Sequence, residues 1–399
     1  MSAALDADVI VAGAGPAGAV AALRLAEAGR RVILCDRHAF PRDKACGDGL
    51  IADSLAVLKT LGLQARVAAA AFRTTKLHTF SPGGVEVQFD ANFLVVPRRV
   101  FDQVLFERAL EAGAEFRQLT VDGPLHEGDR VVGVTGRSPG RDDAIELRAP
   151  LTLLATGADG GVLKKFDERA RVQSSGLAVR TYARLAGGGT LSDLYISLER
   201  DLLPGYAWAF PAPDGLINVG VGAITNRGLR AQNINLRQRL DALLAGKGRL
   251  GSLLGPMRDA ERQRGAPLRT GLVGARVGRP GLAIVGEAAG TTYAVTGEGI
   301  GKAMESGLLA AELAENAGSA LSDVGPKYAE ELISRYAWRF AAYTKAERWV
   351  ARPLVADFVA RRANRSRWVH DRLTGVIMER DLPNKVFSAS SIWKLLTKA

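Results

Sequence analysis

Three glycines near the N-terminus have the spacing of a phosphate-binding turn. Gly13, Gly15 and Gly18 follow the apolar run 8–12 and precede an Ala- and Leu-rich stretch typical of a helix. In such a strand–turn–helix unit the first glycine permits the tight turn, the second lets the backbone approach a pyrophosphate, and the third lets the helix pack closely on the strand. The helix N-terminus then offers free N–H groups to the phosphates.

An acidic residue follows where a ribose contact is expected. The predicted strand 31–36 ends at Asp36, which comes 18 residues after Gly18. A carboxylate at about that distance binds a ribose hydroxyl in dinucleotide-binding folds. The neighbouring Arg37 would suit a 2′-phosphate instead, but the acid favours a plain adenosine ribose. Strand, turn, helix and acid in register therefore predict dinucleotide binding.

A second set of polar and glycine residues lies far along the chain. The segment GEAAG at 286–290 follows the apolar run 281–285, and TGEGI at 296–300 opens a predicted helix. A carboxylate after a strand can hold a polyol hydroxyl, and a helix N-terminus can hold an anionic ring oxygen. Contacts so far from the glycine turn suit a long cofactor extended across the domain. This favours a flavin dinucleotide over NAD.

Further motifs follow in a fixed order between residues 8 and 311. Arg98-x-x-Phe101-Asp102 and ATGADG at 155–160 are two of them. With the glycine turn and GEAAG, they resemble the p-hydroxybenzoate hydroxylase superfamily of FAD proteins. Within that superfamily, KACGDGL at 44–50, GYAWAFP at 205–211 and TGEGI resemble the geranylgeranyl reductase family.

The resemblance implies a p-hydroxybenzoate hydroxylase-like α/β fold. A Rossmann-type FAD-binding domain would carry an inserted β-rich substrate domain and a C-terminal helical region. The FAD-binding domain would comprise residues 1–75, 98–165 and 276–320. The substrate domain would comprise 76–97 and 166–275, and a basic helical region would occupy 321–399.

The resemblance also implies which residues contact FAD. Arg98 would lie near the ribityl chain or the phosphates, Glu287 would take the polyol contact, and Gly299 and Ile300 would offer N–H groups to the flavin ring. The family usually has Asp where this chain has Glu287, and Pro where it has Ala294, and both departures could shift the ring. The expected FAD contacts are Gly13, Gly15, Pro16, Ala17, Gly18, Asp36, Arg37, Cys46, Gly47, Arg98, Ala155, Gly157, Gly286, Glu287, Gly297, Gly299 and Ile300.

Cys46, Tyr206 and Trp208 are the candidate catalytic residues. Cys46 lies in a glycine-flanked loop, which is an unfavourable place for a core residue. Cys35 lies on a predicted strand and is interpreted as a small buried hydrophobic residue. The resemblance places the Cys46 loop beside the flavin. Tyr206 and Trp208 alternate on a predicted strand and so face the same side. They could be core aromatics, but the resemblance implies that they line a long apolar substrate cavity.

The resemblance implies an FAD-dependent reductase that saturates isolated C=C bonds of a geranylgeranyl or polyprenyl chain. No group polarises such a bond, so a proton must accompany the hydride from reduced flavin N5. The aromatic rings of Trp208 and Tyr206 can stabilise the developing positive charge, and a dry cavity excludes water. The sequence leaves the proton donor open between Cys46 and an ordered water.

A flavin-dependent monooxygenase acting on a small or carrier-bound substrate is the alternative. A halogenase is less favoured, because superfamily halogenases carry Trp-x-Trp-x-Ile where this chain has Tyr206-x-Trp208-x-Phe210. The sequence holds no second nucleotide fingerprint. We therefore expect NADPH or a ferredoxin-like donor to bind transiently as the reductant.

Composition narrows the class of protein. The chain has 399 residues, of which 47% are hydrophobic, and this composition excludes a disordered protein. It has only 2 cysteines, which excludes a small protein held together by disulfides. No basic segment with a following apolar stretch begins the sequence, so a reducing, cytoplasmic location is expected. The histidines show no metal-ligand spacing, and no HExxH motif or P-loop occurs. No metal site is therefore predicted.

Basic residues concentrate toward the C-terminus. Residues 345–399 contain twelve Lys or Arg but only five Asp or Glu. Trp349, Phe358, Trp368 and Trp393 are interleaved with them, a composition that suits peripheral contact with an anionic membrane. A solvated basic face on a helical cap is the other interpretation, and both can hold together. Nucleic-acid binding would rest on charge alone and is not favoured.

Overall fold

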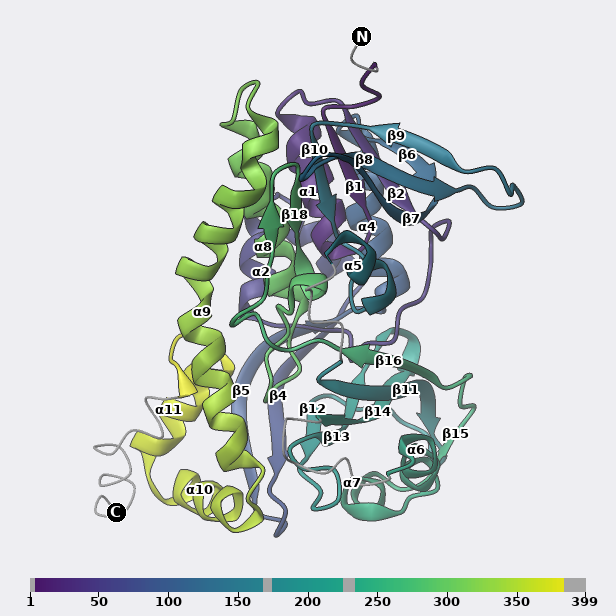
Figure 1. The fold of residues 1–399 in the computed structure, drawn as a ribbon. Helices are drawn as coiled ribbons and strands as arrows, with labels where there is room; N and C mark the ends of the chain where they lie inside the picture. The colour runs from purple at the N-terminus through teal and green to yellow at the C-terminus, as the bar shows by residue number, and fades with distance from the viewer. Residues whose placement is uncertain (1–3, 168–173, 225–233, 384–399) are drawn as a thin grey trace.

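A six-stranded sheet forms the centre of the upper part of the molecule in Figure 1. The computed structural model describes residues 4–167, 174–224 and 234–383. All neighbouring strands pair in parallel except β17 and β18. Parallel strands are buried on both faces, which explains their Val-, Ile- and Leu-rich sequences. The order is β17 (Gly278–Arg279), β18 (Leu282–Ile284), β10 (Leu151–Leu154), β1 (Val9–Ala12), β2 (Val32–Asp36) and β6 (Glu115–Gln118).

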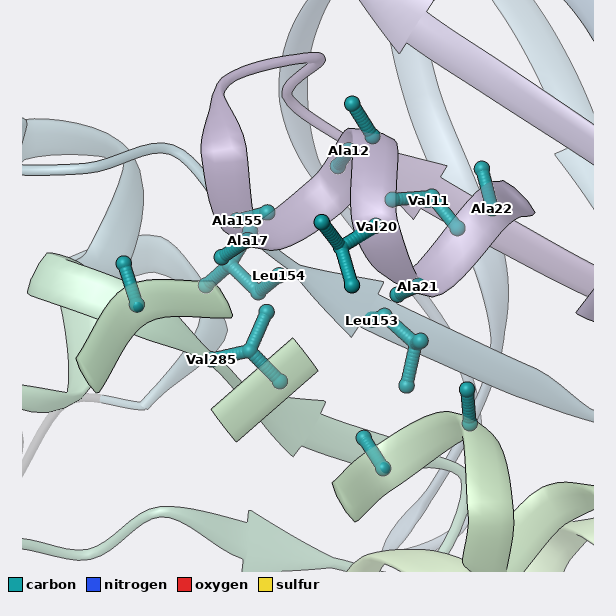
Figure 2. Packing of buried hydrophobic residues seen from close by; sticks show 14 of the residues in the cluster. Val11, Ala12, Ala17, Val20, Ala21, Ala22, Leu153, Leu154, Ala155 and Val285 are labelled. Atoms are coloured by element: carbon teal, nitrogen blue, oxygen red, sulfur yellow. The ribbon is translucent and has the colours of Figure 1, made fainter. Parts of the chain in front are cut away.

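Helices cover one face of this sheet. Helix α1 (Pro16–Glu27) packs against α4 (Arg98–Glu111) and α8 (Ile300–Glu315), and α8 also contacts α2 (Ala52–Thr60). A side chain at Gly307 would place its Cβ 2.2 Å from the Ala17 carbonyl oxygen, so only glycine allows α1 and α8 to approach this closely. Figure 2 shows Val11, Val20 and Leu153 packed together in this core. The short helix α3 (Gln64–Ala69) follows α2.

A three-stranded antiparallel sheet lies beside the central sheet, on strands β10 and β2. It consists of β7 (Thr120–Glu127), β8 (Arg130–Arg137) and β9 (Ile145–Arg148). The polar stretch 122–148 alternates short β-like runs with turns in the sequence, and these runs form an antiparallel β-meander. Helix α5 (Gly160–Phe166) packs against β7.

The second large sheet has nine described strands. Two of them, β4 and β5, extend from the side of the six-stranded sheet into it (Figure 1). Helices α6 (Leu236–Leu244) and α7 (Gly248–Leu254) pack against it. The sequence favours helix over residues 229–262, whereas in the structure a strand begins at Met257, and residues 229–233 lie outside the described residues. Strand β16 (Arg264–Leu268) pairs with β11 and lies outside the main strand order. The main order is β15 (Met257–Arg258), β11 (Gly176–Leu185), β14 (Ile217–Ile224), β13 (Tyr206–Pro211), β12 (Leu194–Ser197), β4 (Phe72–Phe80), β5 (Glu86–Val95) and β3 (Gly49–Leu50).

The C-terminal helices span both sheets. Helix α9 (Val324–Val350) runs along one side of the molecule from α8 and β18 toward β5, and α10 (Pro353–Arg365) and α11 (Arg367–Ile377) follow it (Figure 1). The buried Asp357 fastens α10 to the β4–β5 turn by accepting hydrogen bonds from Ser81 Oγ at 2.7 Å and Gly83 N at 2.5 Å. Trp393 lies outside the described residues. Across the described ranges, no helix has the length and apolarity needed to cross a membrane.

Short 3₁₀ turns complete the described chain. They are Pro213–Gly215, Gly286–Ala289 and Leu321–Asp323. The predicted α/β architecture, with a β-rich second sheet and C-terminal helices, is confirmed. Strand β4 begins at Phe72, before the predicted boundary at residue 75, and pairs within the second sheet. The domain boundaries themselves remain a prediction.

Candidate active site

A cavity of about 630 Å³ is lined by residues of both large sheets and of the C-terminal helices. The glycine turn, the loop 42–49, strand β13, the segment 285–301 and helices α9 to α11 all contribute to its wall. Every residue predicted for the site lines this cavity except Gly18. The fold therefore brings together segments that are up to about 370 residues apart in the sequence.

The three glycines of the turn have different reasons to be glycine. Gly13 has a φ of +113°, and a Cβ there would lie 2.3 Å from the Ala155 carbonyl oxygen. A Cβ at Gly18 would lie 1.8 Å from the Gly13 carbonyl oxygen, so Gly18 acts through packing rather than at the cavity wall. A Cβ at Gly15 would meet only Arg42 Nη2, at 3.4 Å. The protein itself leaves this space open, as a backbone-bound pyrophosphate requires.

Asp36 is held at the end of β2 by backbone hydrogen bonds. Its Oδ2 accepts from Ala14 N and its Oδ1 from His38 N, both at 2.9 Å. An ionised carboxylate has further lone pairs and can still accept from a ribose hydroxyl. Arg37 lies at the rim, where it forms an ion pair of 3.2 Å with Asp159. Asp159 is the N-cap of α5, where its Oδ1 accepts a hydrogen bond of 3.0 Å from Gly161 N.

Arg42 is a cavity residue that the sequence analysis missed. Its Nη1 lies 3.0 Å from Asp102 Oδ2, and its Nε lies 3.7 Å from Asp36 Oδ2. Arg98 also binds Asp102, through Nε at 2.6 Å and Nη2 at 2.8 Å. Burial alone would lower the pKa of Arg98, but the Asp102 carboxylate outweighs burial and raises it. Two guanidinium groups thus stand beside the glycine turn, and only the Arg98 motif marked this region in the sequence.

Two helices begin at the cavity without a side-chain cap. Helix α1 starts after Gly15 and α8 after Gly299, and neither N-cap residue makes a side-chain hydrogen bond. Uncapped N-termini leave N–H groups and a positive dipole end for an anionic ligand. Thr156 Oγ1 also lines the cavity, buried and without a hydrogen-bond partner among the described residues. The donors and the open space at Gly15 fit a ligand that carries phosphates at one end and an anionic ring oxygen at the other.

Glu287 lies at the cavity wall after β18, where the polyol contact was predicted. Its Oε1 accepts a hydrogen bond of 3.2 Å from Arg269 N. Lys44 Nζ approaches its Oε2 to 3.9 Å. These two contacts fix the Glu287 side chain, which is one methylene longer than the aspartate usual in the family. The carboxylate has further lone pairs and can still accept a hydrogen bond from a ligand hydroxyl. No group of metal-ligating side chains occurs among the described residues.

Asn218 links the loop of Cys46 to Trp208. Its Nδ2 donates to the Cys46 carbonyl oxygen at 2.8 Å and to Asp48 Oδ2 at 2.7 Å. Its Oδ1 accepts from Trp208 Nε1 at 3.0 Å. Tyr182 OH donates to the same Asp48 oxygen. One buried amide therefore positions two of the three candidate catalytic residues, and the only signal of it in the sequence is a polar residue inside the apolar strand 217–224.

Burial controls the ionisation of the loop. It raises the pKa of the Cys46 thiol, although Arg98 opposes the change. It also raises the pKa of Asp48 to about 6, against the hydrogen bonds from Tyr182 and Asn218. Burial therefore favours the neutral thiol of Cys46, and it brings the pKa of Asp48 closer to 7 than that of an ordinary aspartate.

Tyr206 and Trp208 form one wall of the cavity. Both lie on β13, and their ring centroids are 6.0 Å apart with the planes tilted by 68°. The Tyr206 hydroxyl donates to the Thr296 carbonyl oxygen, which ties the aromatic wall to the start of α8. A Cβ on Gly220, across the strand pair from Trp208, would lie 2.2 Å from the indole ring.

An apolar extension of the cavity runs between the second sheet and the C-terminal helices. Side chains of β4, β5 and β12 supply one wall, and side chains of α10 and α11 supply the other. The lining residues are Leu77, Val87, Phe89, Phe93, Leu194, Ile196, Val355, Ala356, Val359, Ala360, Leu373, Val376 and Ile377. This part of the cavity suits a hydrocarbon chain.

Comparison with known proteins agrees with this geometry. Residues 6–179 match the model of the FAD binding domain family. The chain is 34% identical to the menaquinone reductase of Mycolicibacterium smegmatis over 369 residues, which cover 84% of this chain and 82% of the relative. It is 30% identical to digeranylgeranylglycerophospholipid reductase 1 of Methanopyrus kandleri, over 78% of this chain and 81% of the relative.

The chain belongs to the geranylgeranyl reductase family of FAD-dependent oxidoreductases. A solved geranylgeranyl bacteriochlorophyll reductase-like protein from Thermoplasma acidophilum has the same p-hydroxybenzoate hydroxylase-like fold, with a TM-score of 0.76 at 20% identity, covering 98% of this chain and 96% of that one. In this member of the geranylgeranyl reductase family, the open space at Gly15, the two uncapped helices and Asp36 fit FAD. Which residues contact it remains a prediction.

Proposed function

We propose that this protein saturates isolated C=C bonds of a polyprenyl chain. The observation that carries the proposal is the apolar cavity extension, which joins the aromatic wall of Tyr206 and Trp208 to a channel under α10 and α11. Relatives at 30–34% identity are named as reductases of menaquinone and of a digeranylgeranyl phospholipid, which supports a prenyl substrate. Bound reduced FAD would supply the hydride.

The chain's own residues would hold the double bond and exclude water. The π faces of Tyr206 and Trp208 favour positive charge that develops on a carbon atom beside them. Asn218 fixes the indole through the hydrogen bond to Trp208 Nε1, so that the ring is already placed before the substrate enters. The apolar walls keep out water that would trap a carbocation.

An anaerobic turnover experiment tests the function. We expect the protein, loaded with FAD and reduced by dithionite, to add two hydrogens per reduced double bond to menaquinone or to a digeranylgeranyl lipid, as read by product mass. A product with one added oxygen atom, formed only when air and NADPH are supplied, would instead assign a monooxygenase. Both candidate electron donors, NADPH and a reduced ferredoxin, can then be compared in place of dithionite.

Helix α10 supports a membrane as the source of the substrate. Its inner face lines the cavity with Val355 and Val359. Its outer face exposes 78% of Leu354 and 39% of Phe358. Arg361 and Arg365 are exposed and continue this face at helical spacing. One helix thus separates the channel from a surface that combines apolar and cationic side chains, which suits an anionic lipid headgroup region.

The membrane contact has a direct test. The double variant Leu354→Glu/Phe358→Glu should bind vesicles containing phosphatidylglycerol at least about tenfold more weakly than wild type, because it loses apolar burial and adds two like charges. Co-sedimentation measures the bound fraction. Leu253→Glu, at a leucine on α7 that is 52% exposed, is the matched control and should bind like wild type. Equal binding by all three proteins would contradict the contact.

A further inference from the structure

Glu298 lies at the cavity wall with an unused carboxyl oxygen. It stands between Gly297 and Gly299 at the start of α8, and its Oε2 is buried without a hydrogen-bond partner among the described residues. Its backbone is fixed, because its carbonyl oxygen accepts from Tyr293 N at 2.9 Å. Neighbouring Thr296 binds the Tyr206 hydroxyl, so Glu298 belongs to the same wall as the aromatic residues.

The charges around Glu298 favour its neutral form. Lys302 is shared by three carboxylates, at 3.3 Å from Asp53, 2.8 Å from Glu305 and 2.8 Å from Glu379. Arg339 adds a second cation, 3.7 Å from Glu379. These cations are thus already engaged by acids other than Glu298.

Burial raises the pKa of Glu298 well above its usual value, and the negative charges of Glu379 and Asp53 raise it further. Lys302 and the hydrogen bond with Thr296 oppose this without cancelling it. The titratable groups that face Glu298 are Asp53 on α2, Tyr206 on β13, Lys302 on α8, Tyr343 on α9 and Glu379 after α11.

The other acids at the cavity are poorer proton donors. Burial raises the pKa of the Tyr206 hydroxyl and of the Cys46 thiol, so both hold their protons more tightly than usual. Asp48 Oδ2 accepts two hydrogen bonds, which favour the carboxylate, and burial raises the pKa of Asp48 only to about 6. A neutral carboxylic acid is the stronger acid among groups that are still protonated at that pH.

We propose that Glu298 is the proton donor for the C=C reduction, an inference that rests on the proposed function. The π electron pair of the double bond forms a C–H bond with the Glu298 proton, and the O–H bond breaks to leave a carboxylate. The hydride adds to the other carbon, which leaves the flavin oxidised by two electrons. A solvent proton then restores the acid. Cys46 is not required as the acid in this scheme.

Glu298→Gln is the first test, because glutamine keeps the size and cannot donate a proton. Bound FAD should be unchanged, and the rate of C=C reduction at pH 7 should fall about 100-fold or more. Glu298→Asp should recover part of the rate. Infrared spectra of the protein without FAD should show a protonated carboxyl C=O band at pH 7 that Glu298→Gln lacks, which is a readout independent of turnover.

The pH profile gives a second test. Because the protonated form donates, the rate should fall as pH rises through the pKa of Glu298. Glu379→Gln removes a negative neighbour, lowers that pKa and should move this fall to lower pH. A Glu298→Gln rate within threefold of wild type, or no infrared difference at pH 7, would overturn the assignment alone. If wild type reduces no polyprenyl substrate, the proposed function fails, and the donor role fails with it.

Discussion

Gly18→Ala is expected to destabilise the protein by about 3 kcal/mol or more, whereas Gly15→Ala should leave stability unchanged and weaken FAD binding. The Gly18 methyl would lie 1.8 Å from the Gly13 carbonyl oxygen and 3.1 Å from Ala155 Cβ. Backbone atoms surround it, so the turn or helix α1 must move, and overpacking of this kind costs at the upper end of the usual range. The Gly15 methyl meets only the end of the Arg42 side chain.

The two substitutions distinguish a glycine required for packing, Gly18, from a glycine that faces the ligand, Gly15. Urea unfolding of the FAD-free proteins measures the first effect, and titration with FAD measures the second. We expect at least a tenfold loss of FAD affinity for Gly15→Ala, which corresponds to about 1.4 kcal/mol. Wild-type FAD affinity in Gly15→Ala would contradict the placement of the pyrophosphate, and wild-type stability in Gly18→Ala would contradict the close approach of α1 to the turn.

Gly220→Ala should displace the Trp208 indole and damage the aromatic wall. Its Cβ would lie 2.2 Å and 2.6 Å from two indole carbons, too close for the ring to stay. Moving the ring breaks the hydrogen bond between Trp208 Nε1 and Asn218, and so loosens the loop that Asn218 holds through the Cys46 carbonyl oxygen. We expect a loss of about 1–3 kcal/mol in stability and at least a tenfold lower rate of C=C reduction per bound FAD.

Gly222 offers a matched control two residues along the same strand. A Cβ there has no neighbour closer than 3.7 Å, so Gly222→Ala should unfold at the same urea concentration as wild type. Unfolding midpoints and turnover per flavin distinguish the two strand positions. A Gly220→Ala protein with wild-type stability and rate would show that the indole position does not matter for the reaction.

Local sequence predicted the elements whose cause is local. The apolar runs 8–12 and 281–285 predict buried strands because their residues are apolar at consecutive positions, and β1 and β18 lie there. Gly18 marks its turn because the atom that most closely excludes a side chain there, the Gly13 carbonyl oxygen, lies in the same strand–turn–helix unit, and Gly13 marks it through its φ of +113°, although a Cβ at Gly13 would also meet the backbone of Ala155 and Thr156. The short strand β15 was missed because two residues carry no periodicity, and only its pairing with β11 makes it a strand.

Only the tertiary structure decided which polar groups meet. Asn218 and Cys46 are 172 residues apart, and Lys302 pairs with both Asp53 and Glu379. No periodicity in the sequence encodes such pairs, because each member alone is an ordinary polar residue on its own strand or helix. The sequence by itself determined the glycine turn, because the turn depends on backbone shape within one unit, and it determined the class of cofactor through short motifs that each can be read within their own segment. The channel, the Asn218 link and the raised pKa of Glu298 depend on burial and on charges from distant segments, which exist only after the chain has folded.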